Sequence, residues 1–358
     1  TPDEVSTSTG YTPTEPASAS SSGSSTEAIV PTEASAGGAF TCELDEDGNA
    51  WCWGSNGYGQ LGNGSTGGSE FDAVPVTMPS GVTFTDISAG GTHACALDTD
   101  GDAWCWGRGH VGQLGNNASA DEDEPVAVTM PSGRFFTNIS AGASHTCAIA
   151  DNEIAYCWGY NNRGQLGIGN TTDADTPQPI FSENFQTISA GEYHTCAVNS
   201  DNKGFCWGYN NKGQLGNNIV VSQVTTPSNI ETPSFVDGFK DIQAGYVFSC
   251  GTIIASGSYA YYTNTVFCWG YGGYLGNNTT DMSRTPVEAQ SCSGSGGFEI
   301  CGVGTGFNSF SVGRDHTCGV MTTGAIGCWG MNTYGQIGDG TTDNAIDITV
   351  TPLPDGVS

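Results

Sequence analysis

Basic residues are scarce in this sequence. Only eight of its 358 residues are Lys or Arg, against 37 Asp or Glu, which gives a formal net charge of −29. A surface this acidic repels the phosphate backbone of nucleic acids, whose binding requires the opposite charge. We therefore exclude nucleic acids as partners.

Long apolar runs are also missing. No stretch of 18 apolar residues occurs, so the sequence predicts no membrane span. A basic segment followed by an apolar one, the mark of a signal peptide, is not visible after Thr1. We interpret the chain as a mature form whose signal has been removed.

Residues 1–34 have little apolar character beyond Ile29 and Val30, and 15 of them are Ser or Thr. Such a segment cannot bury enough surface to offset the entropy lost on ordering. We expect an extended arm or stalk, with Ser/Thr-rich composition typical of O-glycosylation.

Glycine, by contrast, is abundant, with 54 residues, and aromatic residues reach 10%. This combination favours an all-β fold with many tight turns. The tripeptide Cys-Trp-Gly recurs six times, starting at Cys52, Cys105, Cys157, Cys206, Cys268 and Cys328. A period near 50 residues is typical of a β-propeller.

The second copy shows one repeat in full. Residues 84–91 and 93–97 predict two short strands, and the acidic turn at 98–102 separates the second from a third at 103–107. Residues 125–129 predict a fourth strand after a Gly-Gln-Leu-Gly connection. Four short strands per repeat make one propeller blade.

We therefore expect residues 35–358 to form a propeller of six four-stranded blades, six being favoured over seven. The repeats run over about residues 35–83, 84–135, 136–185, 186–238, 239–308 and 309–358. The fifth is longest, with an extended hairpin at 251–265 and an insertion at about 289–307. We also expect residues 32–37 to add a strand to the C-terminal repeat, so that the two ends share a closing blade without an open edge.

The repeat consensus is Ala-Gly-x-x-His-x-Cys-Ala-Leu, a turn, and x-Cys-Trp-Gly-x-Asn-x-x-Gly-Gln-Leu-Gly. It resembles the repeat of the regulator-of-chromosome-condensation family, and the two cysteines resemble its exported members. The resemblance covers about residues 35–358. The family's nucleotide-exchange activity belongs to nuclear members beside chromatin, which does not suit an acidic, cysteine-rich chain.

The 14 cysteines predict disulfides within hairpins. Cys42 and Cys52 are equidistant from the turn at Asp47, and residues placed in this way face each other at a separation that suits a disulfide. Zinc ligation is the alternative, but Cys-x-x-Cys pairs are absent. The predicted pairs are Cys42–Cys52, Cys95–Cys105, Cys147–Cys157, Cys196–Cys206, Cys250–Cys268, Cys292–Cys301 and Cys318–Cys328. Disulfides on this scale indicate an extracellular or cell-surface location.

No residue stands out as catalytic. His93, His145, His194 and His316 share one repeat position, and a residue that recurs once per blade is better explained by structure, its ring bonded to backbone near the channel. Catalysis would need one of them beside a nucleophile and an orienting acid. His110 lies outside this register and is expected in a loop.

Two further kinds of site remain open. The turns at 45–49 and 98–102 group oxygen ligands that could hold Ca²⁺, but they lack the distal Glu of a calcium loop, so we predict no cofactor. Six Asn-x-Ser/Thr sequons are candidate glycosylation sites: Asn63, Asn117, Asn138, Asn170, Asn277 and Asn278.

Together these features predict a non-enzymatic extracellular protein. The main hypothesis is a structural subunit of a cell surface or filament, whose partner is a second copy bound head-to-tail through the arm. The alternative is a secreted propeller that recognises another surface protein or a glycan through one face.

Overall fold

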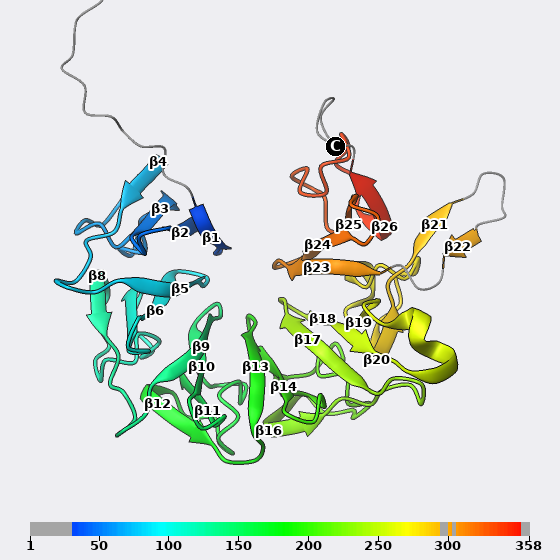
Figure 1. Ribbon diagram of the computed structural model, residues 1–358, viewed down its shortest axis with the longest axis horizontal. Helices are drawn as coiled ribbons and strands as arrows, with labels where there is room; N and C mark the ends of the chain where they lie inside the picture. Colours follow the sequence, from blue (N-terminus) through cyan, green and yellow to red (C-terminus); the bar gives the residue numbers. More distant parts are fainter. Residues whose placement is uncertain (1–30, 294–299, 303–305, 352–358) are drawn as a thin grey trace, which may run out of the picture.

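Six small antiparallel sheets, one for each Cys-Trp-Gly repeat, surround a central channel in the computed structural model (Figure 1). The structure describes residues 31–293, 300–302 and 306–351. Each sheet consists of four consecutive strands, with the first strand of each repeat nearest the channel. The prediction of an all-β propeller with six four-stranded blades is confirmed.

The blades are numbered in chain order. Blade 1 contains β1 (Pro31–Ala36), β2 (Phe40–Asp45), β3 (Ala50–Ser55) and β4 (Ser69–Pro75); blade 2 contains β5 (Phe84–Ala89), β6 (His93–Asp98), β7 (Ala103–Gly107) and β8 (Glu122–Ala127). Blade 3 contains β9 (Phe136–Ala141), β10 (His145–Ala150), β11 (Ala155–Gly159) and β12 (Ala174–Ile180); blade 4 contains β13 (Phe185–Ala190), β14 (His194–Asn199), β15 (Gly204–Tyr209) and β16 (Gln223–Asn229). Blade 5 contains β17 (Gly238–Ala244), β18 (Phe248–Ile254), β19 (Val266–Gly270) and β20 (Ser283–Glu288); blade 6 contains β23 (Phe307–Val312), β24 (His316–Met321), β25 (Ile326–Gly330) and β26 (Ala345–Thr351).

The irregular elements all belong to the fifth repeat. Its extended hairpin carries the 3₁₀ helix η1 (Gly257–Tyr262), and a second one, η2 (Gly272–Tyr274), follows β19. The predicted insertion contains the hairpin of β21 (Ser291–Ser293) and β22 (Ile300–Gly302).

Two strand starts differ from the sequence predictions, and the predicted ends of β5, β6 and β8 differ by one or two residues. The fourth strand of blade 2 begins at Glu122 rather than Pro125, because this outer edge strand is largely solvated and has no apolar alternation to mark its start. β1 begins at Pro31, so residues 31–34 of the predicted arm belong to the first blade.

Most of the hydrophobic core lies between blades. In blades 2 to 6, the Trp of the Cys-Trp-Gly motif packs against the preceding blade, where a Gly leaves room for its ring. Trp158, for example, lies against Gly115 and donates a hydrogen bond from Nε1 to the carbonyl of Gln113 at 3.0 Å. Trp106, Trp207 and Trp269 make the same bond to Gln60, Gln165 and Gln214. The Gln-Leu-Gly signature therefore forms the packing site for the Trp of the next blade, which we call the Trp socket.

We expect Gly115→Ala to destabilise the fold much more than Gly133→Ala. Both glycines have φ near +70°, but a Cβ on Gly115 would lie 2.7 Å from Trp158 Nε1, whereas a Cβ on Gly133 meets nothing within 4 Å. Gly133→Ala should cost only the left-handed strain, about 1 kcal/mol. Gly115→Ala should lower the free energy of unfolding by about 2 kcal/mol more than Gly133→Ala does, since it also displaces a buried Trp. Chemical denaturation of both variants checks this, and equal losses would contradict the socket.

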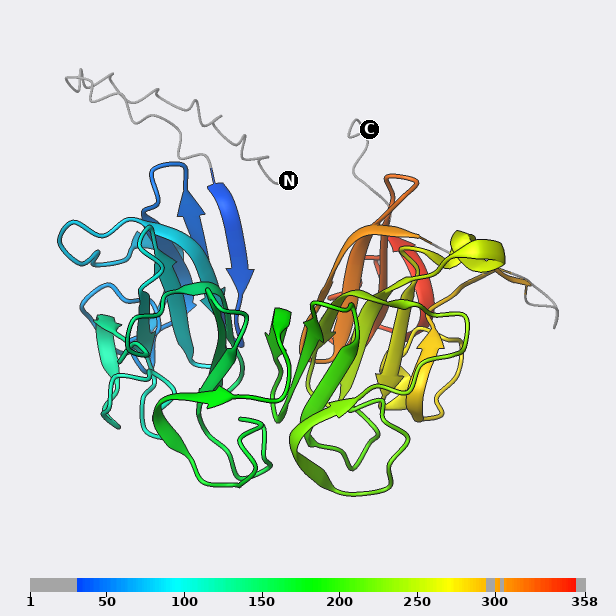
Figure 2. The same ribbon diagram turned by 60° about the horizontal axis from the view of Figure 1, so that its bottom comes forward.

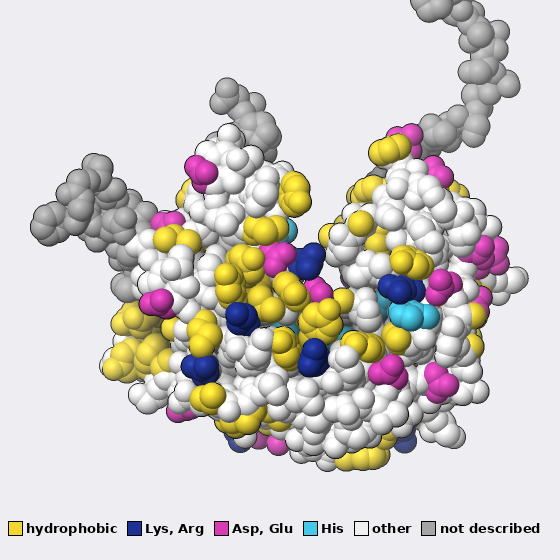
Figure 3. Space-filling view, turned by 180° about the vertical axis from the view of Figure 1, so that it is seen from behind, with side chains coloured by type: hydrophobic (Ala, Val, Ile, Leu, Met, Phe, Trp, Pro, Cys, Tyr) yellow, Lys and Arg dark blue, Asp and Glu magenta, His cyan; other side chains and the backbone are white. Residues whose placement is uncertain are grey.

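The ring is open between blades 1 and 6 (Figures 1 and 2), and the space-filling surface has a notch there (Figure 3). The predicted shared closing blade is therefore wrong: β1 pairs with β2, and each end has a complete blade of its own. Side chains that face a neighbour elsewhere are uncovered at the notch. Trp53 is half-buried while its five counterparts are fully buried, and Val320 is 40% exposed.

Candidate functional site

The cysteines form bridges across hairpins. Six of the seven predicted pairs are linked in the structure, each between directly paired residues of the second and third strands: 42–52, 95–105, 147–157, 196–206, 250–268 and 318–328. The backbone register also places residue 292 opposite residue 301, in the β21–β22 hairpin. No free cysteine occurs in the described part of the chain.

The recurring histidines join neighbouring blades. His93 Nε2 lies 2.8 Å from Thr146 Oγ1 of the next blade, and that hydroxyl donates to the carbonyl of Gln113. The hydroxyl must therefore accept a hydrogen bond from the histidine, so Nε2 carries a hydrogen. His145 and His194 repeat this arrangement with Thr195 and Ser249. The structural role is as predicted, but the partner is a side-chain hydroxyl rather than backbone, because the ring lies between two blades.

Burial keeps these imidazoles neutral. It lowers the pKa of His93 to about 4 and, with smaller effects of neighbouring histidines on His145, the pKa of His145 and His194 to about 3. His316, on the uncovered side of blade 6, is half-exposed. His110 lies exposed in the loop between β7 and β8, as expected.

The carboxylates that begin the acidic turns accept hydrogen bonds from groups of the same hairpin. Asp98 Oδ1 accepts the backbone N–H groups of Asp100 and Asp102, and its Oδ2 accepts Trp104 Nε1–H at 2.9 Å. Asp45 is bonded in the same way within its turn. These bonds explain the Asp-rich turn without Ca²⁺, and no cluster of three or more metal-ligating side chains is found among the described residues.

The six sequons lie in two environments. Asn63, Asn117, Asn170, Asn277 and Asn278 are exposed or half-exposed in the connections after the Gln-Leu-Gly signature or its variant. Asn138 lies within β9, and its amide oxygen is buried. The first five stay candidate glycosylation sites, and Asn138 is the least accessible to a glycan.

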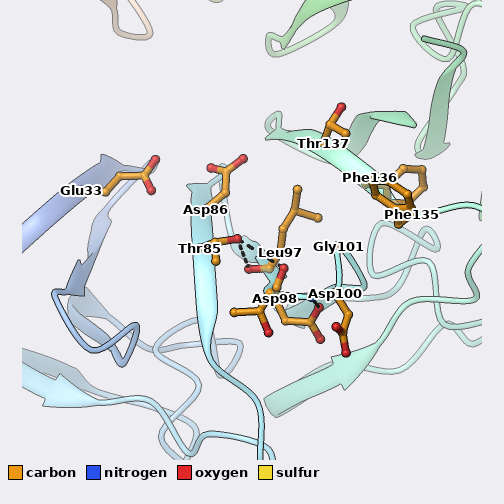
Figure 4. Close-up of a pocket in the computed structure, with 11 residues that line it drawn as sticks. Glu33, Thr85, Asp86, Leu97, Asp98, Asp100, Gly101, Phe135, Phe136 and Thr137 are labelled. Atoms are coloured by element: carbon orange, nitrogen blue, oxygen red, sulfur yellow. Dashed lines mark hydrogen bonds between the residues drawn. The ribbon is translucent and has the colours of Figure 1, made fainter. Parts of the chain in front are cut away.

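A hollow of about 620 Å³ between blades 1 to 3 holds a pair of acids (Figure 4). Burial and the nearby Asp86 raise the pKa of Glu33 to about 7, and burial also raises the pKa of Asp86. Each carboxyl accepts a backbone N–H of the next blade, from Ile87 and Ile139. Polar residues occupy the same register position in the other blades. The two acids are therefore better explained as contacts that hold adjacent blades together than as a catalytic dyad.

The two ends of the ring differ in chemistry. The turns between second and third strands, with their acids, lie at one end, which we call the turn face. The connections between first and second and between third and fourth strands lie at the other, and they carry exposed acids too, among them Asp121, Asp173 and Asp281. Four basic side chains there stack on tyrosine rings at 4.6–5.4 Å: Arg108 on Tyr58, Arg163 on Tyr209, Lys212 on Tyr271 and Arg314 on Tyr246. We call these eight residues the cation–tyrosine face.

Every pair on this face joins adjacent blades. Tyr193 adds a bridge, since its ring centroid lies 6.2 Å from that of Tyr209 and 6.0 Å from that of Tyr246. The row from Arg163 through these three rings to Arg314 therefore crosses blades 3 to 6. Figure 3 shows basic side chains among hydrophobic ones on this part of the surface.

Two acidic groups belong to the row. Glu192 Oε2 lies 3.2 Å and Asp315 Oδ2 lies 3.7 Å from Arg314 Nε, and burial raises the pKa of both carboxyls although the guanidinium opposes the shift. The face is otherwise available to a partner, since Tyr58 and Tyr271 are 37% and 40% exposed and Arg314 is mostly exposed.

The central channel opens beside this face. Its cavity measures about 630 Å³ and is lined mainly by Ala, Gly and Ser of the first strands and the connections that follow them. Such short side chains offer few functional groups. Among the described residues that line it, the charged or titratable side chains are Glu192, Arg314, His316 and Tyr246.

The sequence does not predict the cation–tyrosine face. Its residues occupy variable positions of the repeat, so they recur at no fixed spacing. A usable signal was present: five of the eight basic residues lie near the ends of first or third strands or the starts of fourth strands, which the topology brings to one end of the ring.

Searches of known proteins match the chain to one family. A model of the RCC1-like domain matches residues 4–312, and a regulator of chromosome condensation (RCC1) repeat matches residues 307–336. Human E3 ubiquitin-protein ligase HERC2 is 27% identical over 314 residues, 87% of this chain but 5% of HERC2. The ultraviolet-B receptor UVR8 of Arabidopsis thaliana is 27% identical over 294 residues, 81% of this chain and 50% of UVR8.

The solved structure of human WBSCR16 shares the fold, with a TM-score of 0.77 and 20% identity over 91% of this chain and 83% of WBSCR16. The chain spans half or less of the two curated relatives. No helix long and apolar enough to cross a membrane occurs among the described residues. The repeats, the six blades and the domain match agree: the chain belongs to the RCC1-like domain family.

Proposed function

We propose that this chain is a non-enzymatic extracellular interaction protein that docks a partner on its cation–tyrosine face. The observation that carries the proposal is the concentration of cation–tyrosine pairs at one end of a strongly acidic ring. Tyr and Arg, together with Trp, are the residues that contribute most often to binding energy at protein interfaces. A partner with acidic groups would meet the cations, and the exposed tyrosine edges would add apolar contact.

Two observations support the extracellular and non-catalytic parts of the proposal. The described bridges close six hairpins, a density typical of oxidising compartments. Three of the four recurrent histidines are sealed between blades, where a substrate cannot reach them. A shared propeller fold does not bring a relative's activity with it.

The chain's three lysines offer a direct test. Lys212 belongs to the cation–tyrosine face, whereas Lys203 and Lys240 lie exposed near the turn face. In native extracellular material, an amine-acylating reagent should modify Lys212 about tenfold more slowly than in the purified, dilute chain if nine-tenths of the faces are occupied. Lys203 and Lys240 serve as internal controls with unchanged rates. Equal rates at Lys212 in both samples would refute docking on this face.

A further inference from the structure

We propose that the cation–tyrosine face binds residues 1–30 of a second copy of this chain. The inference rests on the proposed function, since it names the occupant of the same face. Three properties of the chain lead to it: the charge and composition of these residues, the end of the ring where they are attached, and their reach.

The composition of residues 1–30 complements the face. They contain no base and four acids, Asp3, Glu4, Glu15 and Glu27. Pro2, Pro13 and Pro16 favour a polyproline-type conformation, which aromatic-lined surfaces recognise at low entropic cost. Tyrosine rings would pack on the prolines, and the guanidinium and ammonium groups would pair with the carboxylates.

The attachment point favours a second copy over the same copy. β1 starts at Pro31, opposite Asp45 of the first acidic turn, so the preceding residues leave the ring at the turn face. The residues of the cation–tyrosine face lie in connections at the other end of the strands, the end toward which β1, dark blue in Figure 2, points. In a stack of two rings with the same orientation, the turn face of one copy lies over the cation–tyrosine face of the next.

Charge and reach agree with such a stack. The turn face carries Asp47, Asp100 and Asp102 at its hairpin tips. They are opposite in sign to the four cations of the next ring but not to the acids beside those cations, such as Asp121 and Asp173, so the contact depends on direct pairing with the cations. A polyproline-type segment of 30 residues reaches about 90 Å, enough to cross from one ring to the face of the next. Because the two contacting surfaces differ, the contact does not close on itself, and repeated stacking gives a filament.

Three full-length variants test the inference. The arm variant carries Asp3→Asn, Glu4→Gln, Glu15→Gln and Glu27→Gln; the face variant carries Arg108→Gln, Arg163→Gln, Lys212→Gln and Arg314→Gln. The control variant, Arg134→Gln with Lys203→Gln and Lys240→Gln, removes nearly as much charge away from the face. By sedimentation and electron microscopy, wild type and control should form chains of subunits, whereas the arm and face variants should each be monomers.

Mixing the arm variant with the face variant then distinguishes the contact from a folding defect. In the mixture, the arm variant supplies an intact face and the face variant supplies intact acids. The two should therefore form heterodimers, which cannot add further subunits. A synthetic peptide of residues 1–30 should bind the arm variant, whose face is free and intact, at least tenfold more tightly than the face variant, and about 1 M salt should weaken it.

The outcomes separate this inference from the proposed function. Assembly by the arm variant as by wild type overturns the inference, and leaves docking by another partner in place if the face variant fails to assemble. Full assembly by both variants also overturns the inference, and the acylation rate of Lys212 then decides the proposed function by itself. A monomeric wild type overturns the inference because the acids then bind no second copy. Protection of Lys212 at every dilution also overturns it, because the acids then bind the face of their own ring.

Discussion

Acidification from pH 7 to pH 4.5 should reduce the free energy of unfolding by about 6–8 kcal/mol through three buried histidines alone. His93, His145 and His194 are fully buried between blades, and burial lowers the pKa of His93 to about 4 and of the other two to about 3. In the unfolded chain each would titrate near 6.5.

The sign follows from proton uptake. Between the folded and unfolded pKa values the unfolded chain binds a proton that the folded chain does not, so acid favours unfolding. The stabilisation is complete above about pH 6.5 and is lost as the pH falls toward the folded values. Two pH units below 6.5 correspond to about 2.7 kcal/mol for each histidine. The geometry explains the shift: Nε2–H is already bonded, and Nδ1 is buried with no partner in the described part of the chain, so a second proton would be unsatisfied.

The molecule itself provides the matched control. Blades 1 and 5 carry Phe40 and Phe248 at the histidine position, both buried, so the fold accepts a ring without a proton there. A variant with His93→Phe, His145→Phe and His194→Phe should lose about 6–8 kcal/mol less than wild type over the same pH range. Guanidinium denaturation at pH 7 and pH 4.5 measures both. The carboxyl groups are the same in the two chains, so they cancel in the comparison, and parallel pH profiles would refute the prediction.

The sequence predicted best what a single repeat contains. The separation of ten between paired cysteines marks a hairpin with its turn at the midpoint, because antiparallel pairing is a local relation. The number of Cys-Trp-Gly motifs predicts the number of blades, because each blade forms from consecutive strands of one repeat. The recurrence of Gly in Gln-Leu-Gly indicates that a side chain is not tolerated at this position. Only the structure shows the reason, which is the Trp ring of the next blade, as at Gly115 and Trp158.

Relations between blades were predicted less well. The histidine's partner, Thr146 for His93, lies 53 residues away, and no periodicity within one blade identifies it. The open ring was missed because closure depends on the angle between blades, which many weak packing contacts set together. The cation–tyrosine face was missed because its pairs, such as Arg163 with Tyr209, join variable loops of neighbouring blades.

Loss of all the disulfides should abolish the fold. By the chain-entropy estimate, a bridge that closes a loop of ten residues contributes about 2–3 kcal/mol, so the six described bridges contribute roughly 15 kcal/mol together. Folded proteins of this size are stable by only about 5–15 kcal/mol. A chain that is reduced in guanidinium and then dialysed into buffer with reductant should therefore lack the circular dichroism and the cooperative unfolding of the oxidised chain. A reduced chain with a denaturation midpoint close to that of the oxidised one would contradict this, once thiol titration has shown that reduction is complete.

Single bridges separate the entropic contribution from packing. Cys147 and Cys157 are fully buried, whereas Cys318 is half-buried on the uncovered side of blade 6, and the two bridges close loops of equal length. Replacing Cys147 and Cys157 by Ala should cost about 4 kcal/mol, of which roughly 1–2 kcal/mol is lost packing. The same change at Cys318 and Cys328 should cost about 3 kcal/mol, since less buried contact is removed. If the loss of either pair lowers the free energy of unfolding by well under 1 kcal/mol, the bridges do not sustain this fold, and the chain does not require an oxidising location to stay folded.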